Sequence, residues 1–444
     1  MNAQVKSLLS AARLPQTLPG ARAAWLWQAR QAALERFAAR GLPTTRDEEW
    51  KYTDVAAVGK RASLAPERVG TDEKASVVAL EFAQECALPQ PGARRLVFVN
   101  GYYEPALSAA GTLPDGVRLG SLAQTLGAGD DDLSAFFAPA AEHTVFANLN
   151  TAFATDGAVL HLTPGTAVDA PIYLLFIATA EAGAIYPRNL IVAEEGSRAT
   201  VIEHYAGYAG ARNFTVAVTQ IAVGAGAVLD HYKLLQEGGA ALHIAGVHAE
   251  QKAGSRFASH SFALGGRLQR NDITVRLAET GCACILNGLY LAADRQLVDH
   301  HTRIDHLAPG CSSREYYRGV LDGAARGVFN GKVVVQPGAQ KTDAYQANHN
   351  LLLSRQAEID TKPQLEIFAD DVKCTHGATV GQLDEDALFY LRCRGIDAEL
   401  ARSMLIHGFA NDIIGRVEVP ALRAKLEQLL VARLPQGENI EELS

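Results

Sequence analysis

The unit Gly196-Ser-Arg-Ala-Thr-Val-Ile-Glu-His-Tyr205, followed by a polar turn and by Phe214-Thr-Val-Ala-Val-Thr-Gln-Ile-Ala-Val223, decides the fold. Each half is rich in β-branched residues, which is typical of a strand. The glycine that opens the unit recurs with successive spacings of 31, 30, 28, 27, 29 and 28 residues. The members of this series are Gly165, Gly196, Gly226, Gly254, Gly281, Gly310 and Gly338. A repeat of this length with two strands in each unit predicts stacked coils.

The repeat favours a β-solenoid over other β architectures. No amphipathic helix separates the two strands of a unit, so the helical crossovers of a βαβ winding do not fit. A large β-sandwich would place its turns every 8 to 12 residues or so, without a longer period. We therefore predict one β-helix over residues 157–380. Because the ends of such a stack expose strand edges, helical flanks or a partner chain should cover them.

Composition limits the functional classes. The chain has 444 residues, 48% of them hydrophobic, which excludes a largely disordered protein. Its 41 basic and 49 acidic residues give a formal charge of -8, which argues against nucleic acid or an anionic membrane as a partner. We recognise no secretion signal and no long apolar segment, and the six cysteines are scattered like free thiols. These features predict a cytoplasmic protein.

Helical signals flank the predicted solenoid. Residues 20–41 have apolar residues at helical spacing and end at a glycine, and residues 44–54 form a polar segment that we interpret as a docked loop. Residues 70–150 mix short apolar runs with glycine and proline, so we expect a helical and mixed α/β region over 1–156. After the solenoid, the capping aspartates Asp384 and Asp397 and a leucine stripe predict a small helical domain over 381–444.

Cys374 and His376 form the strongest candidate for chemistry. If residues 370–380 are a strand, alternate side chains share a face, so Asp370, Cys374 and His376 point the same way. A thiolate beside an imidazole is a plausible half-site for iron, zinc or copper, although two ligands do not complete a metal site. Simple packing of the cysteine remains the alternative. The pair lies where the predicted solenoid ends, at an edge that a second subunit could cover.

Other polar clusters give weaker signals. Cys282 and Cys284 share a strand face but have apolar neighbours, so we favour packing, and a histidine group at positions 300, 301 and 306 could bind metal but more often is solvated or buried. The run 327–333 lacks the spacing and the Ser or Thr of a phosphate loop, so we expect no intrinsic ATP hydrolysis. We find no catalytic Ser, catalytic Cys or dinucleotide-binding motif, which leaves classical enzyme chemistry unsupported.

The stretch from Asn348 to Ile396 resembles the SufB/SufD family of iron-sulfur cluster assembly proteins. The resemblance is carried by Asn348-His-Asn-Leu-Leu-Leu-Ser354, by Asp370-Asp-Val-Lys-Cys374-Thr-His376-Gly-Ala-Thr-Val-Gly381 and by Leu388-Phe-Tyr-Leu391. The run His-Gly-Ala-Thr-Val-Gly is similar to the SufD branch, whereas the SufB branch has a Cys-Glu-His-Glu-Ala type segment. Near the N-terminus, Arg46-Asp-Glu-Glu-Trp50-Lys-Tyr52-Thr-Asp54 is also similar to the SufD branch.

The resemblance implies a noncatalytic scaffold with a mainly β fold, in which a right-handed β-helix lies between helical regions. In such a scaffold the chain pairs with SufB, the ATPase SufC docks on the C-terminal helices, and a nascent iron-sulfur cluster forms at the interface with SufB. Carried over to this sequence, His376 and Cys374 become the ligand candidates, and the SufC contacts are expected at Leu388, Leu391, Leu405 and Phe409.

Further expectations concern cofactors and assembly. The resemblance implies a transient cluster and no permanent cofactor, with reduced flavin as a possible component of the whole complex, and it leaves open a SufD homodimer in isolation. A β-helix polysaccharide lyase or hydrolase is the alternative reading. That class would need clustered charged residues along one solenoid face and usually a secretion signal.

Overall fold

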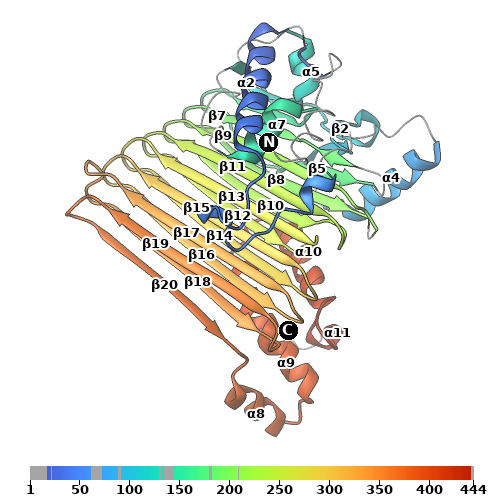
Figure 1. Ribbon diagram of the computed structural model, residues 1–444, viewed down its shortest axis with the longest axis vertical. Helices are drawn as coiled ribbons and strands as arrows, with labels where there is room; N and C mark the ends of the chain where they lie inside the picture. The colour runs from blue at the N-terminus through green and yellow to red at the C-terminus, as the bar shows by residue number, and fades with distance from the viewer. Residues whose placement is uncertain are drawn as a thin grey trace.

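The chain folds as a two-sided β-solenoid with helices toward both ends (Figure 1). The computed structural model describes residues 18–21, 23–61, 73–88, 92–129, 133–134, 144–179, 183–208 and 210–441. Strand makes up 42% and helix 24%, so the fold is mainly β, with about 8 turns of solenoid. The predicted fold class is therefore confirmed. Within the described residues, no helix is both long and apolar enough to span a membrane.

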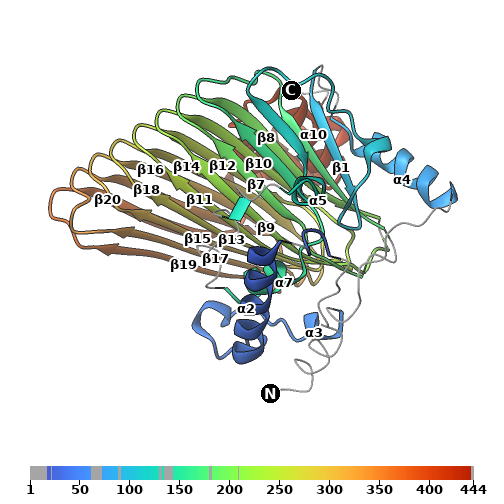
Figure 2. The ribbon, with the colours of Figure 1, turned by 90° about the horizontal axis from the view of Figure 1, so that it is seen from above.

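Successive strands alternate between two sheets, so each coil contributes one strand to each sheet (Figure 2). The order in the first sheet is β2 (Tyr102–Tyr103), β1 (Arg94–Val99), β5 (Ile172–Ala178), β8 (Arg198–Gly207), β10 (Val228–Gln236), β12 (Arg256–Ala263), β14 (Ala283–Ala292), β16 (Ser312–Leu321), β18 (Asp343–Leu352) and β20 (Lys373–Gly381). From β1 to β20 every pairing in this sheet is parallel.

The second sheet faces the first across the solenoid interior. Its order is β19 (Glu358–Ile367), β17 (Arg326–Val335), β15 (Leu297–His306), β13 (Leu268–Leu277), β11 (Leu242–Gln251), β9 (Phe214–Val223), β7 (Arg188–Ala193), β4 (Ala158–Leu162) and β3 (Val117–Ser121), and β6 (Ala184–Ile185) pairs with β9. Because β1 and β3 belong to these sheets, the N-terminal region contributes strands to the solenoid as well as helices.

The repeating glycines lie in one column of turns. Those from Gly165 to Gly310 in the series have φ between 63° and 73°, a left-handed conformation that glycine adopts without steric cost. Their N–H groups donate to the next turn, for example from Gly196 to the Ala225 carbonyl at 2.8 Å. Gly338 departs from the prediction, because the left-handed residue of its turn is Lys341, with φ 63°. Lys341 donates the equivalent hydrogen bond to the Asp371 carbonyl.

Stacked side chains fill the interior between the sheets. Because the parallel strands are in register, equivalent side chains of successive coils lie about 4.8 Å apart. The aromatic rings of Phe98, Phe176 and Tyr205 stack in this way, with ring centroids 4.9 and 4.6 Å apart. They belong to one apolar core that continues through Phe257 and Phe329. Burial of this continuous core stabilises the stack of coils.

N-terminal helices lie on both sides of the solenoid. The helix α2 (Ala24–Arg40) ends at Gly41, close to its predicted bounds, and packs on α7 (Val145–Phe153), which contacts β9 and β11. The helix α4 (Glu73–Cys86) contacts β5 of the other sheet. The shorter elements are η1 (Glu48–Trp50), α3 (Val58–Arg61), η2 (Pro105–Leu107) and α5 (Leu122–Gly127).

The segment 44–54 is a docked loop, as predicted. The Trp50 ring is buried, and the Arg270 guanidinium of β13 lies 3.7 Å from its centroid. The Thr53 hydroxyl donates to the buried carboxylate of Asp299 at 2.5 Å, and Arg270 donates to the same carboxylate at 2.9 Å. Lys362 of β19 donates to Glu48 at 2.6 Å. These contacts hold the segment across the outer face of the second sheet.

The C-terminal helices begin at the predicted caps. Asp384 accepts hydrogen bonds at the start of α8 (Glu385–Cys393), and Asp397 does so for α9 (Ala398–Ile414). Pro420 opens α10 (Pro420–Val431), and α11 (Glu438–Glu441) follows. Leucines of α10 pack on outward-facing residues of the first sheet, and α9 contacts β14 and β16. In contrast, α8 packs mainly on α9 and lies beyond the end of β20 (Figure 1).

Candidate functional site

The last coil of the solenoid is open. Strands β19 and β20 are the terminal strands of their sheets, so each has a neighbour on one side only. Every residue of β20 is exposed except Cys374, which is half-buried, whereas most of the preceding strand β18 is buried. A terminal strand of this kind carries unpaired backbone N–H and C=O groups that can accept another chain.

His376 lies in the middle of this open edge. In the parallel register it is the neighbour of Gln346, whose buried side chain points into the interior. His376 therefore faces the space between the two sheets, at the end where no further coil covers it. Its exposed imidazole is free to meet a second chain or an incoming metal ion.

A buried polar pair lies directly behind His376. The Gln346 amide donates to the Glu315 carboxylate at 2.7 Å, and the three residues occupy equivalent positions on β20, β18 and β16. Burial raises the pKa of Glu315 from 4.5 to about 7. A Cβ atom on Gly331 of β17 would collide with the Gln346 side chain, so this glycine makes room for the pair. Glu315 thus holds a proton over part of the neutral pH range.

Cys374 shares the inward face of β20 with His376, as the alternation predicted. Two residues of a strand are separated by about 7 Å, so both side chains could approach one cluster. The Cys374 side chain packs beside Ala344 and Ala369 in a small apolar group, and burial raises the pKa of its thiol. Asp370 is not on this face, because β20 begins at Lys373 and Asp370 lies in the preceding bend.

The chain by itself offers an incomplete metal site. Across the described ranges, no three His, Cys, Asp or Glu side chains gather closely enough to hold a metal ion. An imidazole and a thiol at an uncovered edge could supply part of a first coordination shell, with the rest coming from a facing chain or from the cargo itself.

The other predicted metal candidates are not brought together. His300 points into the core, and burial lowers its pKa to about 4, whereas His301 faces outward and contacts Asp299 at 3.1 Å. His306 is buried and hydrogen-bonds Ser313 at 3.0 Å. The run 327–333 is part of the straight strand β17, and does not form a phosphate-binding loop.

The four predicted docking residues of the C-terminal domain share an intermediate exposure. Leu388 and Leu391 of α8 and Leu405 of α9 are half-buried. Phe409 faces the solenoid, where the Arg318 guanidinium lies 4.7 Å from its ring centroid. The most exposed apolar residues of this domain are two that the sequence reasoning missed, Phe389 at 68% and Tyr390 at 56%. The sequence signal that could have identified them is their adjacent position on a short helix.

Exposed apolar residues also mark the open coil, and the sequence reasoning missed these as well. Ile367 ends β19, Phe368 follows it, and Val380 lies near the end of β20. Their exposed fractions are 40%, 60% and 50%. Ile367 and Phe368 lie at the turn that leads into β20, whereas Val380 lies near the other end of that strand. Exposed apolar side chains of this kind are typical of protein interaction surfaces. The signal in the sequence was the presence of apolar residues at the ends of the last two strands.

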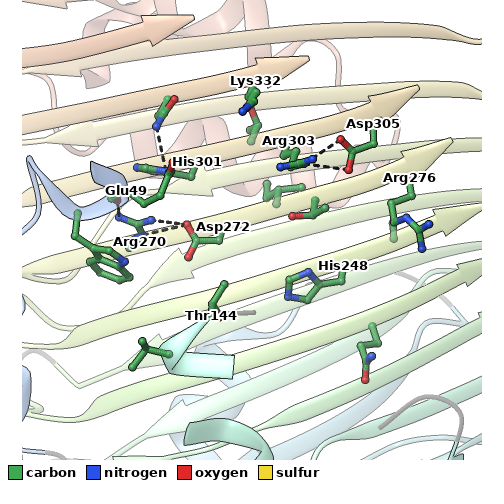
Figure 3. Close-up of a pocket in the computed structure, with 18 of the residues that line it drawn as sticks. Glu49, Thr144, His248, Arg270, Asp272, Arg276, His301, Arg303, Asp305 and Lys332 are labelled. Atoms are coloured by element: carbon green, nitrogen blue, oxygen red, sulfur yellow. Dashed lines mark hydrogen bonds and ion pairs between the residues drawn. The ribbon is translucent and has the colours of Figure 1, made fainter. Parts of the chain in front are cut away.

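A groove of about 1050 Å³ lies elsewhere, on the outer face of the second sheet (Figure 3). Apolar and charged side chains both line it, and several of the charged groups form ion pairs. Arg276 contacts Glu250 at 2.7 Å, and Arg270 contacts Asp272 at 2.9 Å. Within each of these two pairs the opposite charges compensate each other. Neither Cys374 nor His376 lines it, and we do not identify it with the candidate site.

Comparisons with known proteins identify similarities along most of the chain. The family model described as "SUF system FeS cluster assembly, SufBD core domain" matches residues 176–409, and "SufBD protein N-terminal region" matches residues 12–174. The iron-sulfur cluster assembly protein SufD of Escherichia coli is 34% identical over 92% of this chain and 93% of its own length. A SufBD family protein of Synechocystis is 33% identical over 91% of this chain and 90% of its own.

Proposed function

The chain belongs to the SufBD family of iron-sulfur cluster assembly proteins, and from this premise we propose that it is the SufD-type scaffold subunit of a cluster-assembling complex. It would act without catalysis of its own, in the cytoplasm, by presenting half of a cluster site to SufB. The observation that carries the proposal is the exposed His376 at the open end of the solenoid. Two family models that together cover most of the chain support the same reading.

In this proposal His376 is a ligand of the nascent cluster, with Cys374 as its neighbour. A neutral imidazole is a suitable ligand for iron, and an exposed imidazole needs no structural change to reach it. Cys374 must first lose a proton that burial retains, so we assign it the secondary role. The cluster is a transient cargo, and no permanent cofactor is proposed. If reduced flavin takes part, we place it in the whole complex and not in this chain alone.

The test is His376→Ala in the assembled complex. We expect normal complex formation and an unchanged thermal midpoint, with a lower iron and sulfide content after cluster assembly. His349→Ala is the matched control, because His349 lies one strand away on the outer face and hydrogen-bonds Thr379 at 2.8 Å. Normal cluster content in the His376 variant, or a loss fully explained by dissociation of the complex, would contradict the ligand role.

We further propose that SufB docks on the open coil. The unpaired edges of β19 and β20 and the exposed residues Ile367, Phe368 and Val380 support this assignment. Phe368→Asp should weaken co-purification with SufB and leave the fold intact, because the side chain is exposed. The same substitution should also break a SufD homodimer, if one forms in isolation through this edge. Unchanged association of the variant would refute the assignment.

For SufC we propose docking around α8. The exposed rings of Phe389 and Tyr390 lie on a helix that protrudes from the solenoid, which suits a contact for a second protein. Removing residues 384–434 would strip α10 from the sheet it covers, so a point variant is the cleaner experiment. Phe389→Asp should abolish SufC binding, whereas Arg402→Asp, at an exposed position of α9, should not. Full binding by the Phe389 variant would contradict the proposal.

A further inference from the structure

Two cysteines occupy the same position in adjacent coils, away from the open end. Cys282 directly precedes β14 and Cys311 directly precedes β16, and these strands pair in parallel with Ala283 beside Ser312. The ladder continues one residue outward, because the Ser312 N–H donates to the Cys282 carbonyl at 2.9 Å. The two cysteines are therefore neighbours across one rung of the sheet.

Their side chains converge on one backbone oxygen. The Cys282 Sγ atom lies 3.1 Å from the Glu279 carbonyl oxygen, and the Cys311 Sγ atom lies 3.2 Å from the same oxygen. Both thiols are buried, but each lies just below a turn whose tip is exposed. The shared contact places the two sulfur atoms near each other on the same side of the ladder.

The backbone spacing suits a covalent bond between them. Neighbouring parallel strands lie about 4.8 Å apart, and disulfides form between cysteines whose Cα atoms are about 4.4 to 6.8 Å apart. The pair can therefore be bridged by side-chain rotation, without separating the coils. Cys284 is unsuited to such a bond, because its neighbours in the adjacent coils are Phe257 and Ser313.

The environment also differentiates the two thiols. A hydrogen bond from Cys311 is the main cause that lowers the pKa of Cys282 from 9.0 to about 7, and the same contact raises the pKa of Cys311. A thiolate is the nucleophile in thiol oxidation, and we assign the first attack to Cys282, because it is the thiol of the pair whose pKa is lowered. Burial raises the pKa of Cys284, which keeps that thiol protonated.

We propose that Cys282 and Cys311 form a reversible intramolecular disulfide when the chain meets a peroxide. The Cys282 thiolate attacks one peroxide oxygen, the O–O bond breaks, and a sulfenic acid forms with release of water. The Cys311 sulfur then displaces the sulfenic oxygen as a second water molecule while the S–S bond forms. Two thiols and one hydrogen peroxide thus give one disulfide and two waters, with two electrons passing from sulfur to oxygen. A dithiol reductant reverses the reaction.

The experiment uses the full chain carrying Cys374→Ser and Cys393→Ser, which leaves four of the six cysteines. After treatment with hydrogen peroxide, free thiols are alkylated and the digest is analysed by mass spectrometry. We expect a peptide pair joined through Cys282 and Cys311, a loss of two of the four titratable thiols, and full recovery with dithiothreitol. Cys284→Ser should leave this cross-link unchanged.

Two further measurements, one on a variant and one on the unfolded chain, test the proposal. In Cys311→Ser, oxidation should stop at a Cys282 sulfenic acid, which dimedone traps. In urea, where the fold no longer pairs the two thiols, peroxide should give mixed cross-links. The proposal fails if the folded chain yields no Cys282–Cys311 peptide at a peroxide concentration that oxidises Cys393 in the wild type. It also fails if folded and unfolded chains give the same distribution of cross-links.

Discussion

Glu315→Gln should make the stability of the solenoid less sensitive to pH. Glu315 is fully buried behind the candidate site, and burial raises its pKa from 4.5 to about 7. Between these two pH values the unfolded chain loses the proton and the folded chain keeps it. The folded state then binds more protons than the unfolded state, so stability falls as pH rises through this window and stays lower above it.

The size of the pKa shift of Glu315 determines how much the stability changes with pH. A difference of one pKa unit corresponds to about 1.36 kcal/mol, so the rise to about 7 costs the wild type about 3 kcal/mol at pH 8 relative to pH 4. Glutamine has the shape of the protonated carboxyl group, and its carbonyl oxygen can still accept the hydrogen bond from Gln346. The variant should therefore match the wild type at pH 4 and exceed it by about 3 kcal/mol at pH 8.

Urea unfolding of both proteins, followed by circular dichroism at the two pH values, measures this difference. Other titrating groups contribute equally to both chains and cancel when the two are compared. Glu195→Gln makes the same change of charge on an exposed turn and should show no pH-dependent gain. The argument from the buried carboxyl group is wrong if Glu315→Gln raises the free energy of unfolding by the same amount at pH 4 and pH 8, or by more at pH 4.

Two other substitutions test the packing of the coils. Gly288→Ala places a Cβ atom against the tyrosine ring of the next coil and should destabilise the chain by about 1 to 3 kcal/mol in urea unfolding, whereas Gly377→Ala has open space and should be neutral. Arg270→Met leaves the buried carboxylate of Asp299 without its arginine and should cost about 3 kcal/mol, while Arg276→Met breaks an exposed ion pair and should cost less than about 1 kcal/mol. Equal losses of stability in the two glycine variants, or in the two arginine variants, would contradict the corresponding argument.

The solenoid could be predicted because its turns and strands obey local rules. A left-handed turn residue favours glycine whatever the rest of the chain does, so the glycine period reports the coil length directly. The rule is a preference, and Lys341 shows its limit, since a non-glycine residue takes the left-handed position beside Gly338. The caps at Asp384 and Asp397 were predictable for the same reason, because an N-cap depends on one side chain and the next two or three backbone N–H groups.

The candidate site was predictable only in part. Strand alternation placed Cys374 and His376 on one face, but it could not show that β20 starts too late to include Asp370. The solvent exposure of these side chains could not be predicted from the sequence either, because it depends on which strands have neighbours in the sheet. Phe409 is half-buried against the solenoid, while Phe389 on the protruding helix is 68% exposed, although both are phenylalanines within predicted helices. The solenoid alone did not separate an iron-sulfur cluster assembly protein from a polysaccharide lyase, and family membership does.

The open coil has polar residues at its centre and exposed apolar residues at its margin. This distribution suits a coil that no further coil covers. An interior that ended on stacked aromatic rings would need permanent cover. Instead the column that ends at β20 runs through the buried polar pair Glu315 and Gln346 to His376, whose exposed imidazole can face water when no partner is present. The apolar groups stand toward the ends of the last strands, at Phe368 and Val380. A partner that covers this margin would remove water from around His376 without burying an unpaired charge, so association and ligand binding would strengthen each other at the same edge.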